Sequence, residues 1–134
     1  MNPGNYLFDT NALIRLQSDP EFIKQFDPQQ SRLFIPVIAL GELYFGAEKS
    51  SRPDENFLAI EPLAGTMPIL PIDQETAEYY GRLKAKLEKI GRPPSENDLW
   101  IASLAVQHDL QLVSQDQHFQ TIAQIIPALK VVHF

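Results

Sequence analysis

The fold is decided near the N-terminus, where residues 6–14 read YLFDTNALI. Tyr6-Leu7-Phe8 is a short apolar run of the kind that forms a buried strand, and a helical pattern that includes Leu13 begins near Thr10. Asp9 stands at the junction and is the only charged side chain among the first 14 residues. The stretch therefore predicts a buried strand that runs into a helix, with one isolated acid between them.

The same alternation continues along the rest of the chain. We expect further short strands at residues 33–35, 69–70, 110–114 and 130–133. We expect helices at residues 37–48, 54–64, 73–90 and 97–108. Strands that alternate with helices are typical of α/β folds. The sequence thus predicts an α/β fold with a central parallel β-sheet of four to five short strands flanked by α-helices.

Two of these helices carry informative features. For the helix at residues 73–90 we expect Asp73 as N-cap and Gly91 as the residue that ends it. The helix at residues 97–108 is apolar nearly all round, so we expect it to be buried on most sides.

Composition limits the class of protein. With 134 residues, 44% of them hydrophobic, the chain is long enough to bury one core, and we expect a single domain spanning residues 1–134. It has no cysteine, which excludes disulfides, thiolate metal sites and thiol catalysis. Its start does not resemble a signal peptide, and no window approaches the ~20 apolar residues of a membrane-spanning helix. We therefore expect a soluble, cytoplasmic protein with no membrane partner.

The formal net charge of −6 comes from 17 acids and 11 bases, and by itself it counts against a nucleic-acid binder. Seven of the 11 bases, however, lie between Lys49 and Arg92. An acidic average can hide a basic stripe, so the charge does not exclude RNA as a partner.

Four acids stand alone in apolar sequence, unlike the acids that alternate with bases on solvated helices. They are Asp9, Glu42, Asp98 and Asp116. Burying an unpaired carboxylate costs several kcal/mol, and no Lys or Arg nearby in the sequence compensates these four. A divalent cation is the simplest group that would neutralise them.

Each of these acids also has a structural interpretation. Asp9 could cap a helix, Asp98 could be a first-turn acid beside the helix dipole, and Asp116 could be an ordinary turn residue. Glu42 has no such routine role, because it lies in the middle of an apolar helix. One shared site explains all four with fewer coincidences.

The expected topology brings the four acids to one place. Ligands of open parallel sheets bind beyond the carboxyl ends of the strands, and all four acids can reach that edge. Ligand sets made of oxygen alone suit Mg²⁺ or Mn²⁺. Such ions would activate a water, position a phosphodiester and stabilise the leaving oxygen.

Four segments, in this order, resemble the motifs of the PIN-domain family. They are Leu7–Ile14, Ile38–Ala47, Gly91–Ala102 and Leu112–Phe119. Each segment alone is weakly specific, whereas the ordered set is specific and spans nearly the whole chain.

The resemblance implies a PIN fold and a Mg²⁺- or Mn²⁺-dependent endoribonuclease that cleaves RNA phosphodiester bonds by metal-activated water. It assigns Asp9, Glu42, Asp98 and Asp116 as catalytic, metal-binding acids. It places Thr10, Asn11 and Ser114 as polar support for these acids. The compact size is similar to that of VapC-type toxins of toxin–antitoxin (VapBC) systems, which implies a small VapB-like antitoxin as partner and a homodimer.

The chain departs from the family pattern at three positions. Ser114 stands where Thr is more usual, and both residues supply a hydroxyl. His118 occupies a place where an acid is common before the Phe. Asp109 replaces the Gly usually found after the buried helix, and Asp tolerates the left-handed backbone conformation. None of these changes removes a predicted metal ligand.

Further residues have two interpretations each. His118 is a surface residue or a group that helps to move a proton. Glu96 is a solvated loop acid or an auxiliary ligand. Arg82, Lys86 and Lys89 share one helical face, which is either simply solvated or a stripe that contacts RNA phosphates.

Other functional classes fit less well. An aspartyl phosphatase would need a second Asp two residues after Asp9, where Asn11 stands, and a phosphorylation-receiver domain would need paired acids there. The glycine-rich Lys motif of P-loop kinases is missing. The alternative that remains is a non-catalytic PIN-like module that binds RNA or protein.

Overall fold

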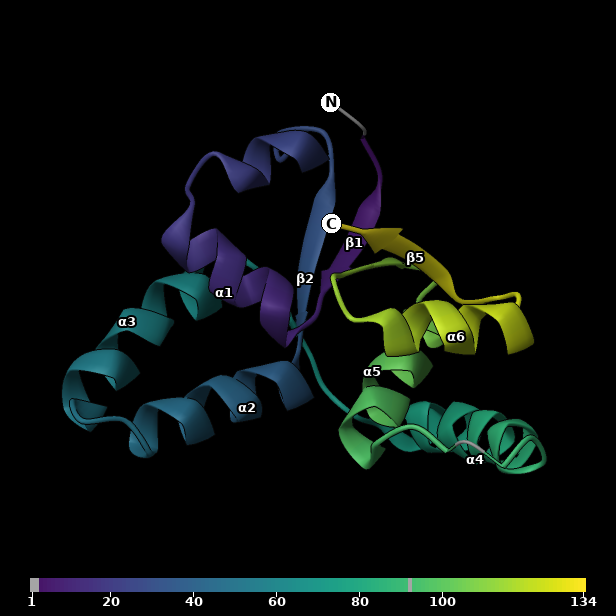
Figure 1. The fold of residues 1–134 in the computed structure, drawn as a ribbon. Coiled ribbons are helices and arrows are strands. Elements are labelled where there is room, and N and C mark those ends of the chain that lie inside the picture. Colours follow the sequence, from purple (N-terminus) through teal and green to yellow (C-terminus); the bar gives the residue numbers. More distant parts are fainter. Residues whose placement is uncertain (1–2, 92) are drawn as a thin grey trace.

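The computed structural model describes residues 3–91 and 93–134, so Arg92, one of the bases counted above, lies outside the described residues. The chain alternates strands and helices (Figure 1). The elements are β1 (Asn5–Phe8), α1 (Thr10–Ser18), the 3₁₀ helix η1 (Phe22–Phe26), β2 (Arg32–Pro36), α2 (Val37–Glu48), α3 (Pro53–Thr66), β3 (Ile69–Leu70), α4 (Gln74–Glu88), α5 (Glu96–Gln107), β4 (Gln111–Ser114), α6 (Gln117–Ile125) and β5 (Lys130–His133).

The five strands form one parallel sheet in the order β3-β2-β1-β4-β5. The central strand β1 pairs with β2 on one side and with β4 on the other, so that Leu7 lies between Phe34 and Leu112. After β1, the chain adds β2 and β3 on one side of β1, and then β4 and β5 on the other side. A sheet wound this way opens a crevice at the carboxyl end of its central strands. The predicted α/β fold with a parallel sheet is confirmed.

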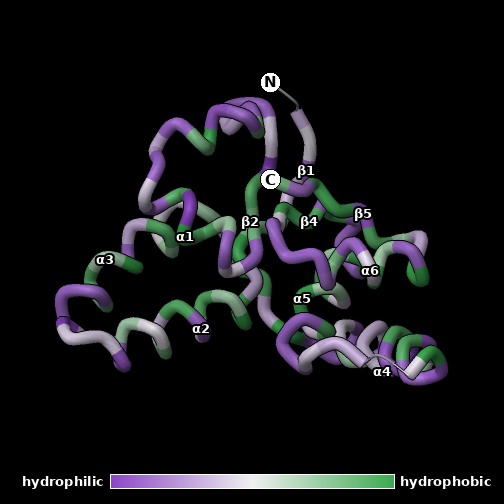
Figure 2. The backbone as a smooth tube through the Cα atoms, in the orientation of Figure 1, coloured by the Kyte–Doolittle hydropathy of each residue, from purple (hydrophilic) through white to green (hydrophobic). Residues whose placement is uncertain are grey.

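The core follows the predicted strands and the apolar helix. Leu7 and Phe8 of β1, Leu112 and Val113 of β4, and most of α5 are buried. Figure 1 shows α1, α2 and α3 on one side of the central strands and α4, α5 and α6 on the other. In Figure 2, α2 is mostly hydrophobic, whereas α4 alternates hydrophobic and hydrophilic residues as a half-exposed helix does.

The start of α4 agrees with the predicted cap, and its end comes earlier than predicted. Asp73 accepts a hydrogen bond from the Thr76 N–H at 2.9 Å and caps α4, although the helix ends at Glu88, two residues before the predicted end. Gly91 has a φ of +74° beyond that end. Asp109 follows α5 with a φ of +52°, as expected for the residue that replaces Gly.

The structure contains two helical elements that the sequence analysis did not predict, η1 and α6. η1 is a short 3₁₀ helix held by aromatic packing, since Phe26 contacts Tyr6, Phe8 and Phe22 edge-on with ring centroids 5.1–5.2 Å apart. α6 begins at Asp116, which caps it by accepting the His118 N–H. η1 depends on contacts that a short sequence window does not contain, whereas the cap of α6 is local to residues 116–118.

Among the described residues, no helix combines the length and the apolar character needed to cross a membrane.

The burial of the central strands gives a stability prediction. Leu112→Ala leaves a cavity in a fully buried site, and we expect it to lower the free energy of unfolding by about 2–5 kcal/mol. Leu58→Ala is the matched control, because this side chain is 64% exposed. We expect it to change the free energy of unfolding by less than about 0.5 kcal/mol. Urea denaturation of the two variants checks this, and equal effects would contradict the described core.

Candidate metal centre

Asp9 is fixed at the carboxyl end of β1 by contacts from two elements. Its Oδ1 accepts a hydrogen bond from the Ala12 N–H at 2.9 Å, which caps α1. Its Oδ2 accepts a hydrogen bond from the Ser114 hydroxyl at the end of β4. The carboxylate therefore joins the two central strands at the crevice, and the residue is only 3% exposed.

The charge on this carboxylate is disfavoured in the metal-free protein. Burial, and to a smaller extent the nearby Asp116 and Asp98 carboxylates, raise the pKa of Asp9 to about 6. The hydrogen bonds from Ser114 and Ala12 offset only part of the rise. With this pKa, about half of the Asp9 carboxyls are protonated near pH 6. An ordinary Asp has a pKa near 3.9 and is almost fully ionised at that pH. A cation bound beside Asp9 would restore the charged form.

Asp98 and Asp116 approach each other from two helix starts. Asp98 lies in the first turn of α5, where its N–H is 3.2 Å from the Ser95 hydroxyl that caps the helix. Asp116 caps α6, and its own N–H donates to Ser114 Oγ at 2.9 Å. Potential ligand atoms of Asp98, Asp116 and His118 all lie within 4.8 Å of one another. One ion could therefore be shared by these side chains.

Glu42 reaches the same place from α2. Burial raises its pKa, and the charge on Asp98 raises it too, while the neighbouring Thr10 hydroxyl lowers it. Burial likewise raises the pKa of Asp98, which Asp116 raises further. Asp9 and Glu42 lie outside the 4.8 Å group, but the charge on Asp98 acts on both of them. The structure thus brings all four predicted acids to one edge of the sheet.

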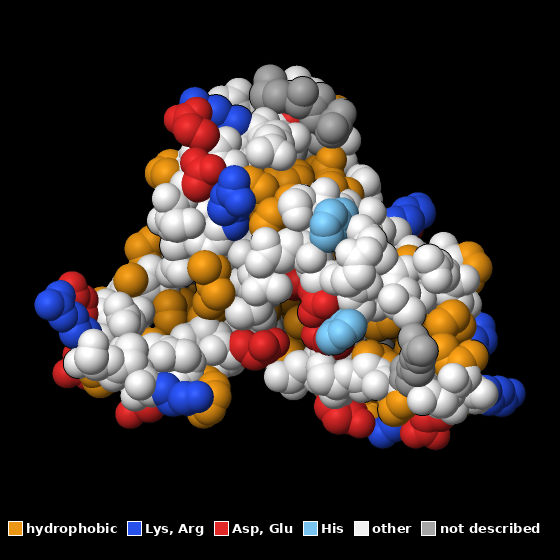
Figure 3. Space-filling model, in the orientation of Figure 1, with side chains coloured by type: hydrophobic (Ala, Val, Ile, Leu, Met, Phe, Trp, Pro, Cys, Tyr) orange, Lys and Arg blue, Asp and Glu red, His pale blue; other side chains and the backbone are white. Residues whose placement is uncertain are grey.

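The chemistry of the site fits a hard divalent cation. Its donors are carboxylate and hydroxyl oxygens with one imidazole nitrogen, and oxygen donors are the ligands that Mg²⁺ and Mn²⁺ prefer. The buried Thr10 hydroxyl lies beside Glu42, whose pKa it lowers, so it adds an oxygen at the edge of the acids. Figure 3 shows acidic side chains together with a histidine in the notch between the two lower lobes of the molecule.

Of the predicted supporting residues, Ser114 contacts the acids, and no such contact is found for Asn11 among the described residues. Ser114 bridges Asp9 and Asp116 through its hydroxyl, as a supporting residue should. The side chain of Asn11 makes no hydrogen bond to the four acids in the part of the chain that the structure describes. Its proposed supporting role therefore has no contact behind it.

Other predicted residues lie away from the cluster. Glu96 is exposed and pairs with the Lys84 Nζ at 2.9 Å and with the Tyr80 hydroxyl, which links α5 to α4. Arg82, Lys86 and Lys89 are exposed on α4 or at its end, and no contact ties them to the acids among the described residues.

His118 lies next to two of the four acids, although most of its side chain is exposed to solvent. Its Nδ1 lies 3.4 Å from Asp116 Oδ1 and 4.0 Å from Asp98 Oδ2, although the side chain is 74% exposed. The sequence contained one sign of this, since His118 follows Asp116 by two residues at a position where the family commonly has an acid.

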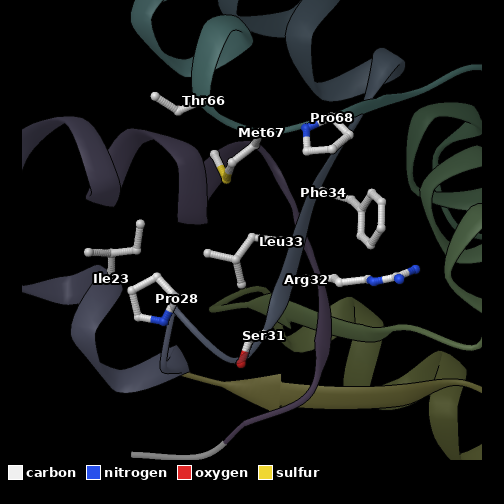
Figure 4. Close-up of a pocket in the computed structure, with 9 residues that line it drawn as sticks. All are labelled: Ile23, Pro28, Ser31, Arg32, Leu33, Phe34, Thr66, Met67 and Pro68. Atoms are coloured by element: carbon white, nitrogen blue, oxygen red, sulfur yellow. The ribbon is translucent and has the colours of Figure 1, made fainter.

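A separate cavity of about 450 Å³ borders β2, and Figure 4 shows the side chains around it. It is lined by Ile23, Pro28, Ser31, Arg32, Leu33, Phe34, Thr66, Met67 and Pro68. None of the four acids lines this cavity. The acids therefore form a site of their own.

Comparisons with known proteins point to one family. A family model described as PIN domain matches residues 6–125. The chain is 34% identical over 113 residues to ribonuclease VapC2 of Haemophilus influenzae, covering 83% of this chain and 86% of the relative. It is 32% identical over 123 residues to the tRNA(fMet)-specific endonuclease VapC of Salmonella typhimurium, covering 90% and 93%.

Solved structures agree in fold. DNA-bound VapBC from Salmonella typhimurium matches with a TM-score of 0.83 at 27% identity, covering 99% of this chain and 98% of that one. VapBC-1 from nontypeable Haemophilus influenzae matches with a TM-score of 0.81 at 30% identity, covering 96% and 97%.

The raised pKa of Asp9 gives a pH dependence of stability. A carboxyl whose pKa is higher in the folded protein makes its full contribution to the free energy of unfolding below its pKa in the unfolded chain. This contribution is lost as the pH rises through the pKa that the group has in the folded protein. In chelator, we expect the free energy of unfolding to fall by about 1–2 kcal/mol more in wild type than in Asp9→Asn between pH 5 and 7.5. Asn keeps the capping oxygen, so the variant should fold.

Urea denaturation at a series of pH values measures this difference. Asp54→Asn, at an exposed acid of α3, should retain the wild-type slope. Saturating Mn²⁺ should remove the wild-type loss. Identical slopes for wild type and Asp9→Asn would contradict the assigned burial of the charge.

Proposed function

The chain belongs to the PIN-domain family, and from this membership we propose that it is a VapC-type endoribonuclease, the toxin of a toxin–antitoxin pair. The observation that carries the proposal is the meeting of Asp9, Glu42, Asp98 and Asp116 at the carboxyl edge of the sheet. Relatives that cover more than four-fifths of the chain are named ribonucleases or endonucleases. The substrate class we propose is RNA.

The protein's own residues would prepare the site for metal-dependent hydrolysis. We propose the four acids as ligands of Mg²⁺ or Mn²⁺, which when bound supplies water activation and stabilises negative charge on the phosphate. The contacts from Ala12 and Ser114 hold Asp9 in one orientation before any ligand arrives. Ser114 also positions the backbone of Asp116. Such prior fixing lowers the reorganisation that binding and reaction would require.

The RNA must be bound by a protein with a net charge of −6. A bound metal ion would offset part of that charge where the phosphate would lie. Arg82, Lys86 and Lys89 are exposed and therefore available to more distant phosphates, and we keep them as proposed RNA contacts. We assign Glu96 to pairing with Lys84, and not to the metal.

The proposed partner is a small VapB-like antitoxin. A groove of about 260 Å³ runs between α1, α2 and α3, with Glu42 on its wall and apolar residues such as Ile14 and Ile60 beside it. An apolar helix or segment fits such a groove, and an Arg inserted among the acids would bind carboxylates and displace metal. The solved neighbours are VapBC complexes.

We also propose a homodimer and a cytoplasmic location. Phe45 is 64% exposed, and it is an apolar side chain that a protein contact would cover. The cytoplasm is where the proposed RNA substrate is found. A non-catalytic PIN-like module is the weaker proposal, because such a module would have no need of four acids at one edge of the sheet.

Removing one ligand tests the activity. Asp98→Asn should abolish cleavage of a generic single-stranded RNA in Mg²⁺ or Mn²⁺, as should chelation of the wild type. The variant should remain folded, because removing a charge from a repulsive cluster does not destabilise the metal-free protein. Gel analysis of the RNA measures this, with Asp54→Asn as an active control. Full activity of Asp98→Asn would refute the assignment.

Growth tests the proposed partner. Expression of the chain alone should slow growth, and co-expression of its antitoxin should restore it. Glu42→Gln should abolish the toxicity, whereas Glu48→Gln, at an exposed acid of the same helix, should leave it unchanged. Normal growth and intact bulk RNA with well-expressed wild type in the native host would contradict the toxin assignment.

A further inference from the structure

A second cavity, of about 320 Å³, lies beside the metal centre and is not used by the proposed mechanism. It is formed by the end of α4, the segment after it, and α6. Its lining is Leu87, Ile90, Pro93, Pro94, Ser95, His118, Thr121, Ile122 and Ile125.

Two of the lining residues connect the cavity to the acids. Ser95 caps α5 at the N–H of Asp98. The His118 Nδ1 lies 3.4 Å from Asp116 and 4.0 Å from Asp98, while the same side chain lines the cavity. A group bound to the acids is therefore one side chain away from the cavity mouth.

The lining is mostly apolar with a few polar groups. Leu87 and Ile122 form a buried apolar floor, at 1% and 3% exposure. Among the described residues that line it there is no Lys, Arg, Asp or Glu. The polar groups are the Ser95 and Thr121 hydroxyls and the His118 imidazole. Apolar walls with a few polar groups are the usual composition of sites that bind small organic groups, of which a nucleobase is one.

We propose that this cavity receives one nucleobase of the RNA, next to the phosphate that is cleaved. The proposal rests on the proposed ribonuclease function, because the phosphate at the acids is what brings the base to the cavity. Single-stranded RNA is read by bases that leave the stack, lie against aromatic or histidine rings and hydrogen-bond at their edges. His118 would supply the stacking surface, and Ser95 and Thr121 the hydrogen-bonding hydroxyls. The cavity would then select the cleavage position.

The test uses a single-stranded RNA whose cleavage position by the wild-type protein has been mapped. Abasic nucleotides are placed one at a time on either side of that position. We expect one abasic position to lower kcat/KM at least about 5-fold, as the loss of one stacked base does. Thr121→Trp, which fills the cavity from its exposed rim, should cut the intact RNA as slowly as wild type cuts this abasic RNA. Gln124→Trp, an exposed residue of α6 that does not line the cavity, is the matched control and should behave as wild type.

Binding without cleavage gives an independent readout. In the Asp98→Asn background, 2-aminopurine at the sensitive position should change its fluorescence on binding, and added Thr121→Trp should abolish the change. Equal cleavage of intact and abasic RNAs by an active, metal-dependent wild type would overturn the cavity proposal alone. The absence of metal-dependent cleavage would instead overturn the ribonuclease function. If Thr121→Trp weakened only antitoxin binding and left the base dependence intact, the cavity would belong to the protein partner and the proposal would be wrong.

Discussion

The structure around the four acids depends on burying the Asp9 carboxylate at the carboxyl end of β1. Removing this charge from water is costly, and the hydrogen bonds from Ala12 and Ser114 offset only part of the cost, as the pKa of about 6 shows. Because one of these donors is on α1 and the other on β4, the same bonds fix how the two central strands meet. Asp9 therefore links α1 to β4, and it is also the acid whose charged form a bound cation would stabilise most.

The other acids extend this arrangement and add to its cost. Asp98 and Asp116 come from two helix starts, Glu42 comes from the middle of an apolar helix, and each meets carboxylates of like charge. Helix caps supplied by Ser95 and by Asp116 itself position two of them without any ligand. The protein thus holds repelling charges in place through its backbone, and a divalent ion would turn that repulsion into binding energy. The apolar cavity beside His118 adds a neutral surface at the edge of this charged site.

The sequence predicted what local pattern controls and missed what tertiary contact controls. Residues 37–48 and 69–70 formed the predicted helix and strand, and the Asp73 cap was found where expected, whereas α4 ends at Glu88 and not at Ile90 before Gly91. The four acids were singled out by their isolation from other charges, and the structure buries Asp9 and leaves the other three half-buried. η1 was missed because the packing of Phe26 against distant rings defines it. Likewise, no spacing rule shows that His118 lines a cavity made by α4 and α6, since that cavity exists only once those helices pack.

The central claim is that these four carboxylates form one metal site. Anomalous diffraction from crystals soaked in Mn²⁺ tests it directly, because manganese is located independently of any model of the site. We expect an anomalous peak at bonding distance, about 2 Å, from oxygens of at least two of the four acids, with the others within reach of waters on the ion. A protein that takes up Mn²⁺ elsewhere, or shows no peak at this edge of the sheet at millimolar Mn²⁺, would contradict the account.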